Sequence, residues 1–500
     1  MHIFKAGAEK NGNFLLSPPL PPHNEFCNIP FAGVYYEDNT MKEKFWTMNT
    51  VAEFDEKGCY SYKKITAVTL PILLSMLMEH LIGMTDTAFL GRVSEVALGA
   101  SALGMVYFLA FFVLGTGFSF GAQIIIARRN GEKNFDKIGE ICYASGFFLI
   151  LLSLLLVVLI KCFSPSVMPY LVQSPEISKA TCEYLDYRTW GLVFAFGAAI
   201  FRAFFVGIAR TKILTYSSLA MVLSNIVLNY GLIFGKYGLP QMGIAGAALA
   251  SSISEGIAFG CYFLYTLKYV DLKKYGFHIP FAAAFNPVIL KNVFSVSFWM
   301  MLQPFLAVGV WFFFFVAVEH LGERSLAVIN LARALSALPF IIIHAIATSA
   351  NSLVSNIIGE GKTDQVWRLI NKLLLAGLIC VTPLIAFYAL CPELSLRVFT
   401  DNPDLIKDSI NVTYIMCIAS FIQIIAFILF NAVSGTGAIK MTVCIETLNL
   451  VLYAIFVWFI IIKRRPTPAV AWSAEIIYQA VTALLSFLFL LYGKWQNRKL

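Results

Sequence analysis

Twelve stretches of about 20 mostly apolar residues follow one another along the chain, each long enough to cross a bilayer as a helix. Backbone polar groups in lipid must pair within their own segment, and these stretches are too long and continuous for barrel strands. The pattern therefore predicts an all-α, polytopic membrane protein with twelve transmembrane helices. We place them near residues 65–90, 96–127, 138–162, 183–209, 213–235, 243–268, 289–317, 326–357, 370–392, 408–434, 441–463 and 469–492.

The chain also repeats itself at a nearly constant shift of about 230 residues. The repeat is carried by LGRVSEVALGASAL and LGERSLAVINLARAL, by NGEKNFDK and EGKTDQVW, and by VGIARTK and SGTGAIK. Such a repeat predicts two pseudo-symmetric six-helix lobes, and an even number of helices per lobe makes the two halves parallel repeats about an axis along the membrane normal. We expect a polar, disordered cytoplasmic extension at 1–60, an N-lobe at 61–275 and a C-lobe at 276–500.

Composition agrees with this class, because 59% of the residues are hydrophobic and only 13% are charged. The net charge of +8 is typical of basic cytoplasmic loops and does not indicate nucleic-acid binding. Twenty Lys and Arg residues, including Arg128 and Lys372, are counted on the inner side and eleven, including Arg188, on the outer side. We therefore expect both termini in the cytoplasm and the protein in the cytoplasmic (inner) membrane. We expect no cleaved signal peptide, and Met41 and Met48 are alternative starts.

Several polar residues lie where lipid should surround them. Asp86 falls in the first span, where an uncompensated acid costs on the order of 2.5 to 3.5 kcal/mol on insertion scales. Asn225 and Asn229 share one face of the fifth span, and Ser251 and Glu255 repeat the same four-residue spacing in the sixth. Carboxylate, amide and hydroxyl oxygens are the ligands that alkali cations accept, so these residues predict a monovalent cation site. Alternatively, desolvation favours a protonated Asp86, which would then carry a proton.

Four further positions are candidates for roles around this site. Glu79 lies seven residues before Asp86 on about the same helix face, and it could line the same cavity or pair with Arg202. Glu255 could also pair with Arg202. Pro71, fifteen residues before Asp86, removes a backbone hydrogen bond and could act as a bending point.

The second half of the chain gives weaker signals. Glu446, Glu475 and Arg333 are expected to face a C-lobe cavity or each other. The aromatic run 311–315 points all round its helix, so we expect it to be lipid-facing bulk. The ten cysteines are scattered singly, which predicts apolar filler and neither disulfides nor a metal site.

Five segments together carry a resemblance that covers roughly residues 60–495. They are the Pro71 to Asp86 spacing ending in MTDTAFLG, RRNGEKNFDK, FRAFFVGIARTK, NIVLNYGLIFG and MGIAGAALASSIS. With these segments the chain resembles the prokaryotic transporters of the multidrug and toxic compound extrusion (MATE) family. The resemblance implies a twelve-helix antiporter that exports amphipathic, often cationic compounds against Na⁺ or H⁺ entry by alternating access.

By position, the resemblance implies a cation site in the N-lobe and a bending proline at Pro71. The site comprises Asp86, Asn225, Asn229, the Ala247 carbonyl and Ser251. Some members have a second acid where this chain has Asn229. The acids that one branch carries in helices 7 and 10 are replaced by Ala307 and Ile425, with Gln303 and Gln423 nearby. Coupling is therefore expected to rest on the N-lobe, with Gln303 as a cavity candidate in the other half.

Other functions were weighed against this expectation. A flippase for a lipid-linked oligosaccharide shares the architecture but needs a strongly basic cavity for pyrophosphate. A membrane-embedded enzyme needs an intramembrane nucleophile and base or a metal cluster, and only His80 and His344 of the six histidines fall in spans. We therefore expect a transporter rather than an enzyme, without a cofactor beyond the coupling ion. Its expected partners are drug-like small molecules and the bilayer, and we expect a monomer.

Overall fold

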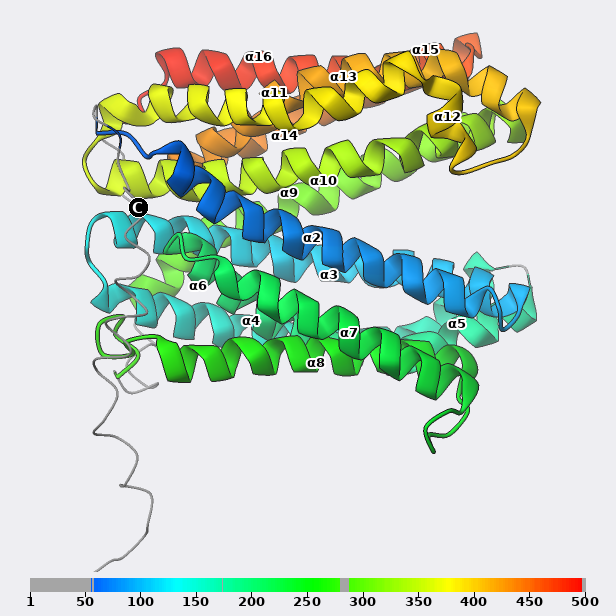
Figure 1. Cartoon of the computed structure of the whole chain (residues 1–500), viewed down its shortest axis with the longest axis horizontal. Helices are drawn as coiled ribbons and strands as arrows, with labels where there is room; N and C mark the ends of the chain where they lie inside the picture. The colour runs from blue at the N-terminus through cyan, green and yellow to red at the C-terminus, as the bar shows by residue number, and fades with distance from the viewer. Residues whose placement is uncertain (1–54, 56–57, 173, 279–286, 497–500) are drawn as a thin grey trace, which may run out of the picture. The chain divides into compact units, whose positions relative to one another are not determined.

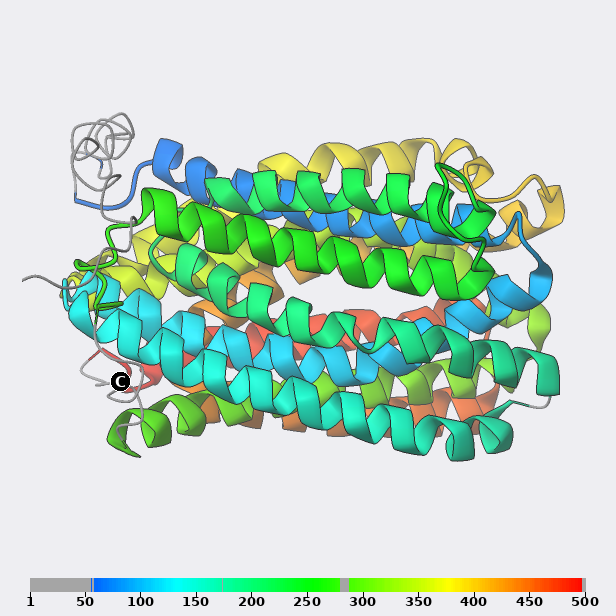
Figure 2. The same ribbon diagram turned by 90° about the horizontal axis from the view of Figure 1, so that it is seen from below.

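The structure is a computed structural model that describes residues 55, 58–172, 174–278 and 287–496. Every regular element in those ranges is helical, and the long helices run roughly along one common direction (Figures 1 and 2). The predicted N-terminal extension lies outside the described residues except for its last few positions. This agrees with the predicted all-α class.

The first half of the chain, which we call the N-lobe, comprises seven helices. They are α2 (Tyr62–Leu90), α3 (Glu95–Gly131), α4 (Asp136–Leu171), α5 (Pro175–Arg188), α6 (Gly191–Gly207), α7 (Lys212–Phe234) and α8 (Gly243–Tyr269). The second half, the C-lobe, comprises α9 (Pro287–Glu319), α10 (Glu323–Gly359), η2 (Thr363–Gln365), α11 (Val366–Leu390), α12 (Pro392–Arg397), α13 (Pro403–Gly435), α14 (Ile439–Phe456), the π-helical η3 (Val457–Ile462), α15 (Pro468–Trp472) and α16 (Ala474–Tyr492).

Eleven of the described helical segments are long and apolar enough to cross a membrane. The twelfth predicted span, residues 183–209, is instead a pair of helices, α5 and α6, that bend by 47° at their junction. The hydroxyl of Ser252 on α8 lies 3.0 Å from the Tyr187 carbonyl and 3.4 Å from the Arg188 carbonyl, so α8 supplies a hydrogen-bond donor to the carbonyls at the break. The described residues thus contain eleven continuous candidate spans and one bent pair that could form a twelfth.

Helix starts follow ordinary capping chemistry. Ser61 and Ser94 accept hydrogen bonds from the backbone amides of Lys64 and Ala97, at the starts of α2 and α3. Proline is the first residue of α5, α12, α13 and α15, where its missing amide hydrogen costs nothing. The ends of these spans are therefore set by local sequence as well as by hydropathy.

The two halves repeat each other in three dimensions and meet at the ends of α3 and α10. The Asn356 amide donates to the Gly207 carbonyl at 2.8 Å, and 228 residues earlier Arg128 donates to the Gly435 carbonyl at 3.4 Å. The same construction therefore joins each half to the other. A Cβ at Gly359 would overlap the Arg128 carbonyl oxygen, so glycine permits the close approach of the two backbones.

The last residues before α2 connect the two halves a second time. The Asp55 carboxylate pairs with Lys372 at 2.7 Å and with Arg368 at 3.0 Å, both on α11. The Lys372 ammonium also donates to the Tyr60 carbonyl at 2.7 Å, and the Tyr60 hydroxyl donates to Glu360 at 2.6 Å. Asp55 and Tyr60 therefore bind the start of the N-lobe to the C-lobe.

Candidate functional site

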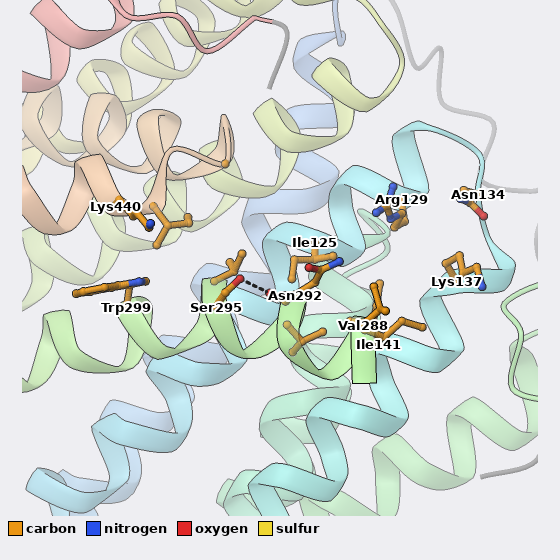
Figure 3. Close-up of a pocket in the computed structure, with 15 residues that line it drawn as sticks. Ile125, Arg129, Asn134, Lys137, Ile141, Val288, Asn292, Ser295, Trp299 and Lys440 are labelled. Carbon is orange, nitrogen blue, oxygen red and sulfur yellow. Dashed lines mark hydrogen bonds between the residues drawn. The ribbon is translucent and has the colours of Figure 1, made fainter. Parts of the chain in front are cut away.

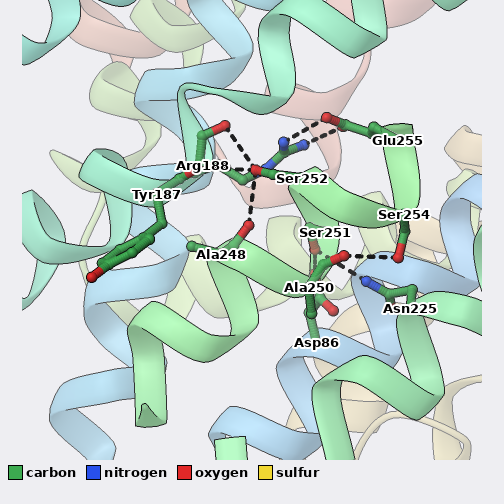
Figure 4. Close-up of polar contacts among 10 residues, drawn as sticks. All are labelled: Asp86, Tyr187, Arg188, Asn225, Ala248, Ala250, Ser251, Ser252, Ser254 and Glu255. Atoms are coloured by element: carbon green, nitrogen blue, oxygen red, sulfur yellow. Dashed lines mark hydrogen bonds and ion pairs between the residues drawn. The ribbon is translucent and has the colours of Figure 1, made fainter. Parts of the chain in front are cut away.

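Three helices of the N-lobe bring the predicted polar residues into one cluster. Asp86 comes from α2, Asn225 and Asn229 from α7, and Ser251 from α8. The Asn229 amide donates to Asp86 Oδ1 at 2.6 Å, and the Ser251 hydroxyl donates to Asp86 Oδ2 at 3.0 Å. Figure 4 shows Asp86, Asn225 and Ser251 pointing toward one another. We call these four residues the Asp86 cluster.

Local sequence explains why α7 and α8 approach closely enough to form the cluster. The four-residue spacing places both asparagines on one face of α7, where Asn229 also donates to Asn225 Oδ1 at 3.0 Å. The start of α8 is rich in Gly and Ala, and a Cβ at Gly246 would lie 2.6 Å from the Leu232 carbonyl oxygen of α7. Small residues therefore allow the backbones to pack at short range, as is common between membrane helices.

The Asp86 cluster is removed from solvent and is incompletely hydrogen bonded. Asp86 is 7% exposed, Ser251 4%, and the two asparagines 0%. The Asn229 Oδ1 atom has no hydrogen-bond partner in the described part of the chain. Amide oxygen and nitrogen are assigned from hydrogen bonding and can exchange by rotation, so both carboxamides can present oxygen to a cation. The donor set consists of hard oxygen atoms, which fit an alkali cation.

Ala247, the fifth residue of the predicted cation site, lies on α8 one turn before Ser251 and is buried. Its position on the same helix places its backbone near the cluster. A contribution of its carbonyl oxygen to cation binding stays a prediction.

An ion pair that the sequence did not predict lies next to the Asp86 cluster. The Arg188 guanidinium donates to both carboxylate oxygens of Glu255, at 2.9 and 2.6 Å, and it lies 3.9 Å from the centre of the Phe108 ring (Figure 4). The sequence interpretation counted Arg188 among the outer loop charges, which is wrong because it ends α5 and its side chain is only 7% exposed. The suggested pairing of Glu255 with Arg202 is therefore also wrong.

The alternative pairing of Arg202 is confirmed. Its guanidinium forms an ion pair with Glu79 and donates to the Ser75 hydroxyl at 3.2 Å. Ser75 in turn hydrogen bonds with Ser218 of α7 at 2.7 Å. Glu79 is thus neutralised by a cationic side chain, whereas no ion pair with Asp86 occurs among the described residues.

Pro71 lies inside α2, and the helix continues through it. Proline cannot donate to the carbonyl four residues earlier, which belongs to Ala67. The Thr211 hydroxyl donates to this carbonyl at 3.3 Å and to the Val68 carbonyl at 2.8 Å. The lost backbone bond is therefore replaced by a side chain at the start of α7, and bending at Pro71 stays a prediction.

The C-lobe contains polar groups of a different kind. The Tyr478 hydroxyl donates to Glu446 at 2.7 Å, and the Tyr453 hydroxyl donates to Glu475 at 3.1 Å. The acids therefore contact tyrosines rather than each other. Gln303 on α9 is partly buried, and its Oε1 atom has no hydrogen-bond partner within the described residues.

The aromatic residues 311–315 in α9 differ in how far they are exposed. Phe312 is 67% exposed, as expected for lipid-facing bulk, but Phe314 is fully buried. The Trp311 indole donates to Glu475 at 3.2 Å, and Arg333 lies over the Phe315 ring. The expectation that the whole run faces lipid is therefore wrong for part of it, because neighbouring helices cover one side of α9.

Comparison with known proteins places this arrangement in a family. The family model MatE matches the chain twice, over residues 71–231 and 300–459, as the internal repeat predicts. A probable multidrug resistance protein NorM of Thermotoga maritima is 26% identical over 451 residues, which cover 87% of this chain and 93% of that protein. The multidrug resistance protein MdtK of Pectobacterium atrosepticum is 24% identical over 382 residues, covering 76% and 81% of the two chains.

A solved structure shares the fold. An outward-facing multidrug resistance MATE family transporter of the MOP superfamily superposes with a TM-score of 0.80 at 17% identity, over 87% of this chain and 97% of that one. The two matches to the family model together cover more than half of the chain, with one match in each half. The chain therefore belongs to the MatE family, whose members are multi-pass membrane transporters for multidrug efflux and not enzymes.

Proposed function

We propose that this protein exchanges amphipathic, often cationic compounds for Na⁺ or H⁺ by alternating access, with the coupling cation bound at the Asp86 cluster. The observation that carries the proposal is a buried carboxylate that is held by an amide and a hydroxyl and has no ion-pair partner among the described residues. Such an acid costs on the order of 2.5 to 3.5 kcal/mol in a bilayer when it is ionised. A bound monovalent cation or a proton removes this cost.

The cluster supports both coupling ions by different routes. Na⁺ would take the Asp86 carboxylate, the asparagine oxygens and the Ser251 hydroxyl as ligands, and the Ala247 carbonyl could complete the set. H⁺ needs only the carboxylate, which prefers its neutral form when desolvated.

Exchange requires that the ion and the substrate prefer different helix packings. The Asp86 cluster joins α2, α7 and α8 through side chains alone, so an ion that reorients those side chains changes how the three helices pack. Pro71 lies in the same helix as Asp86 and gives α2 a position where bending breaks no backbone bond.

The charge of the N-lobe supports this function over oligosaccharide flipping. A pyrophosphate-bearing lipid would need unpaired basic side chains in the cavity. Arg188 is buried and paired with Glu255, so this cation is not available for a phosphate. The multidrug resistance names of the relatives support drug-like substrates. We further propose a monomer in the cytoplasmic membrane with both termini in the cytoplasm.

The test is transport in reconstituted vesicles. Sodium and proton gradients are imposed separately, and efflux of a cationic dye is followed for the wild type and for Asp86→Asn. The control is Asp364→Asn, which removes an exposed acid outside the long helices. We expect one gradient to drive efflux in the wild type and the control, with gradient-driven efflux lost in Asp86→Asn.

Equal gradient-driven efflux by Asp86→Asn and wild type would remove the proposed coupling site. Translocation of a lipid-linked sugar without dye efflux would replace the proposed substrate class with that of a flippase.

A further inference from the structure

A cavity of about 670 Å³ lies at the junction of the two lobes (Figure 3), and no residue of the Asp86 cluster lines it. Its N-lobe wall comes from the end of α3 and the start of α4, and its C-lobe wall comes from the first turns of α9 and the start of α14. All four of these helix ends lie on the side that the Lys and Arg count assigns to the cytoplasm. Nothing in the proposed exchange mechanism uses this cavity.

Among the residues that the structure describes, three cationic side chains line the cavity and no acidic residue does. Arg129 and Lys137 come from the N-lobe and Lys440 from the C-lobe. Figure 3 shows Arg129 and Lys137 toward one end of the α9 segment and Lys440 beside Trp299 toward the other. The lining therefore favours an anion that can be contacted from both lobes.

The cations are available to such an anion. Arg129 pairs with Glu132 at 2.7 Å, and both side chains are partly exposed to solvent. An exposed ion pair of this kind contributes only about 0 to 1 kcal/mol, so a phosphate group can displace it. Lys137 pairs with Glu140 at 2.9 Å, and the Lys137 side chain is half exposed although Glu140 is buried. Lys440 is exposed and has no ion pair within the described residues.

Most of the remaining wall is apolar, and this decides the type of anion. Ile125, Ile141, Val293, Val296 and Trp299 line it. The α9 wall extends from Val288 to Trp299, which is about 16 Å along a helix. A free inorganic anion would gain nothing from such a surface. An amphiphile with a phosphate group and an acyl chain would use both the basic and the apolar walls.

We propose that this cavity binds the headgroup and upper acyl chain of an anionic phospholipid from the cytoplasmic leaflet. Basic pockets between transmembrane helices on this side of a membrane suit anionic headgroups. Because the cations come from both lobes, the lipid holds the lobes together at this end. It therefore favours the conformation of this structure, in which α3 and α4 lie close to α9 and α14. The lining residues of this cavity are separate from those of the Asp86 cluster.

The experiment measures thermal unfolding of the full chain in a neutral detergent. Phosphatidylglycerol, phosphatidylcholine or inorganic phosphate is added to separate samples of three proteins. They are the wild type, the pocket variant Arg129→Gln/Lys137→Gln/Lys440→Gln, and the control variant Lys268→Gln/Lys273→Gln/Lys494→Gln. The control removes the same charge from exposed lysines assigned to the same side of the membrane.

We expect phosphatidylglycerol to raise Tm of the wild type and the control by a few degrees. The rise should be absent from the pocket variant and should shrink as salt is added. Native mass spectrometry should show bound phosphatidylglycerol on the wild type and the control and little on the pocket variant.

Two results would overturn the proposal. An equal rise for the pocket variant and the wild type would show that phosphatidylglycerol binds elsewhere. An equal rise with phosphatidylcholine or with inorganic phosphate alone would show that an anionic lipid is not the ligand. Neither result depends on dye transport, so the lipid site and the proposed function can fail separately.

Discussion

Glu255 has a predicted role that can be separated from that of Asp86. It neutralises Arg188 through two hydrogen bonds of 2.9 and 2.6 Å. Ser251 and Ser252 are adjacent on α8, and they contact Asp86 and the Arg188 carbonyl respectively. Glu255→Gln would therefore leave an unpaired guanidinium close to the Asp86 cluster.

The size of the effect follows from simple electrostatics. Two like unit charges repel each other by on the order of 2 kcal/mol at a separation of about 8 Å and an effective dielectric constant of about 20. This corresponds to roughly a thirtyfold loss of cation affinity. Removing one partner of a buried ion pair also destabilises the fold, by about 3 to 5 kcal/mol. The double variant Arg188→Gln/Glu255→Gln removes the charge together with its partner, so it should recover most of the affinity.

The assay is the dependence of dye efflux on the concentration of the coupling ion, with Tm measured in parallel. We expect Glu255→Gln to need roughly thirtyfold more ion for half-maximal efflux, and the double variant to fall near the wild type. Asp408→Asn is the control, because it breaks an exposed arginine–carboxylate pair at the surface. The reasoning would be refuted if Glu255→Gln responded to the ion like the wild type, or if the double variant were no better than the single one.

Three other predictions test the site and the junction of the lobes. Ser251→Ala removes a proposed oxygen ligand of Na⁺ and should cost about 1 to 3 kcal/mol in Na⁺ affinity, whereas Ser254→Ala, whose hydroxyl bonds only within its own helix, should leave the ion dependence of efflux unchanged. Burial raises the pKa of the Cys59 thiol and slows its alkylation. We expect Lys372→Met to detach the segment around Cys59 and so to speed maleimide labelling of Cys59 in a single-cysteine background, although loss of the Lys372 charge by itself disfavours the thiolate. Unchanged labelling would contradict this prediction. Gly359→Val should lower the stability of the fold by about 1 to 3 kcal/mol in thermal unfolding, because its side chain overlaps a backbone carbonyl of the other lobe, and an unchanged Tm would argue against that close contact.

The site residues that the sequence predicted are polar side chains within apolar spans, where their burial in lipid is unfavourable. Asp86 is costly in a bilayer wherever its neighbours lie, so hydropathy alone marks it. The spacing of Asn225 and Asn229 then gives a shared face, because helix geometry within one segment is fixed. The structure brings both to the same carboxylate, and the ion that binds there remains a proposal.

The pairing of Arg188 was not predicted because a basic residue in a membrane protein can belong either to an exposed loop or to a buried ion pair. A basic residue near a span end usually belongs to a loop, and Arg128, Arg188 and Lys372 were all counted in that way. In the structure each is nearly buried, and each bonds to an acid or to carbonyls of another helix. A local signal for Arg188 existed, since Ser174 and Pro175 form a standard helix start and place it inside a short helix.

The same ambiguity explains why only half of the ion pairing was predicted. Glu79 and Glu255 both needed a cation, and the sequence offered Arg202 to each of them because it was the only arginine deep within an N-lobe span. Which acid receives Arg202 depends on the 47° bend between α5 and α6, a tertiary feature that hydropathy does not encode. That bend carries Arg188 to Glu255 and leaves Arg202 for Glu79. Every acid that α2 and α8 place near the site therefore has its own cation except Asp86, and this difference in pairing separates Asp86, the proposed ion-binding residue, from Glu79 and Glu255.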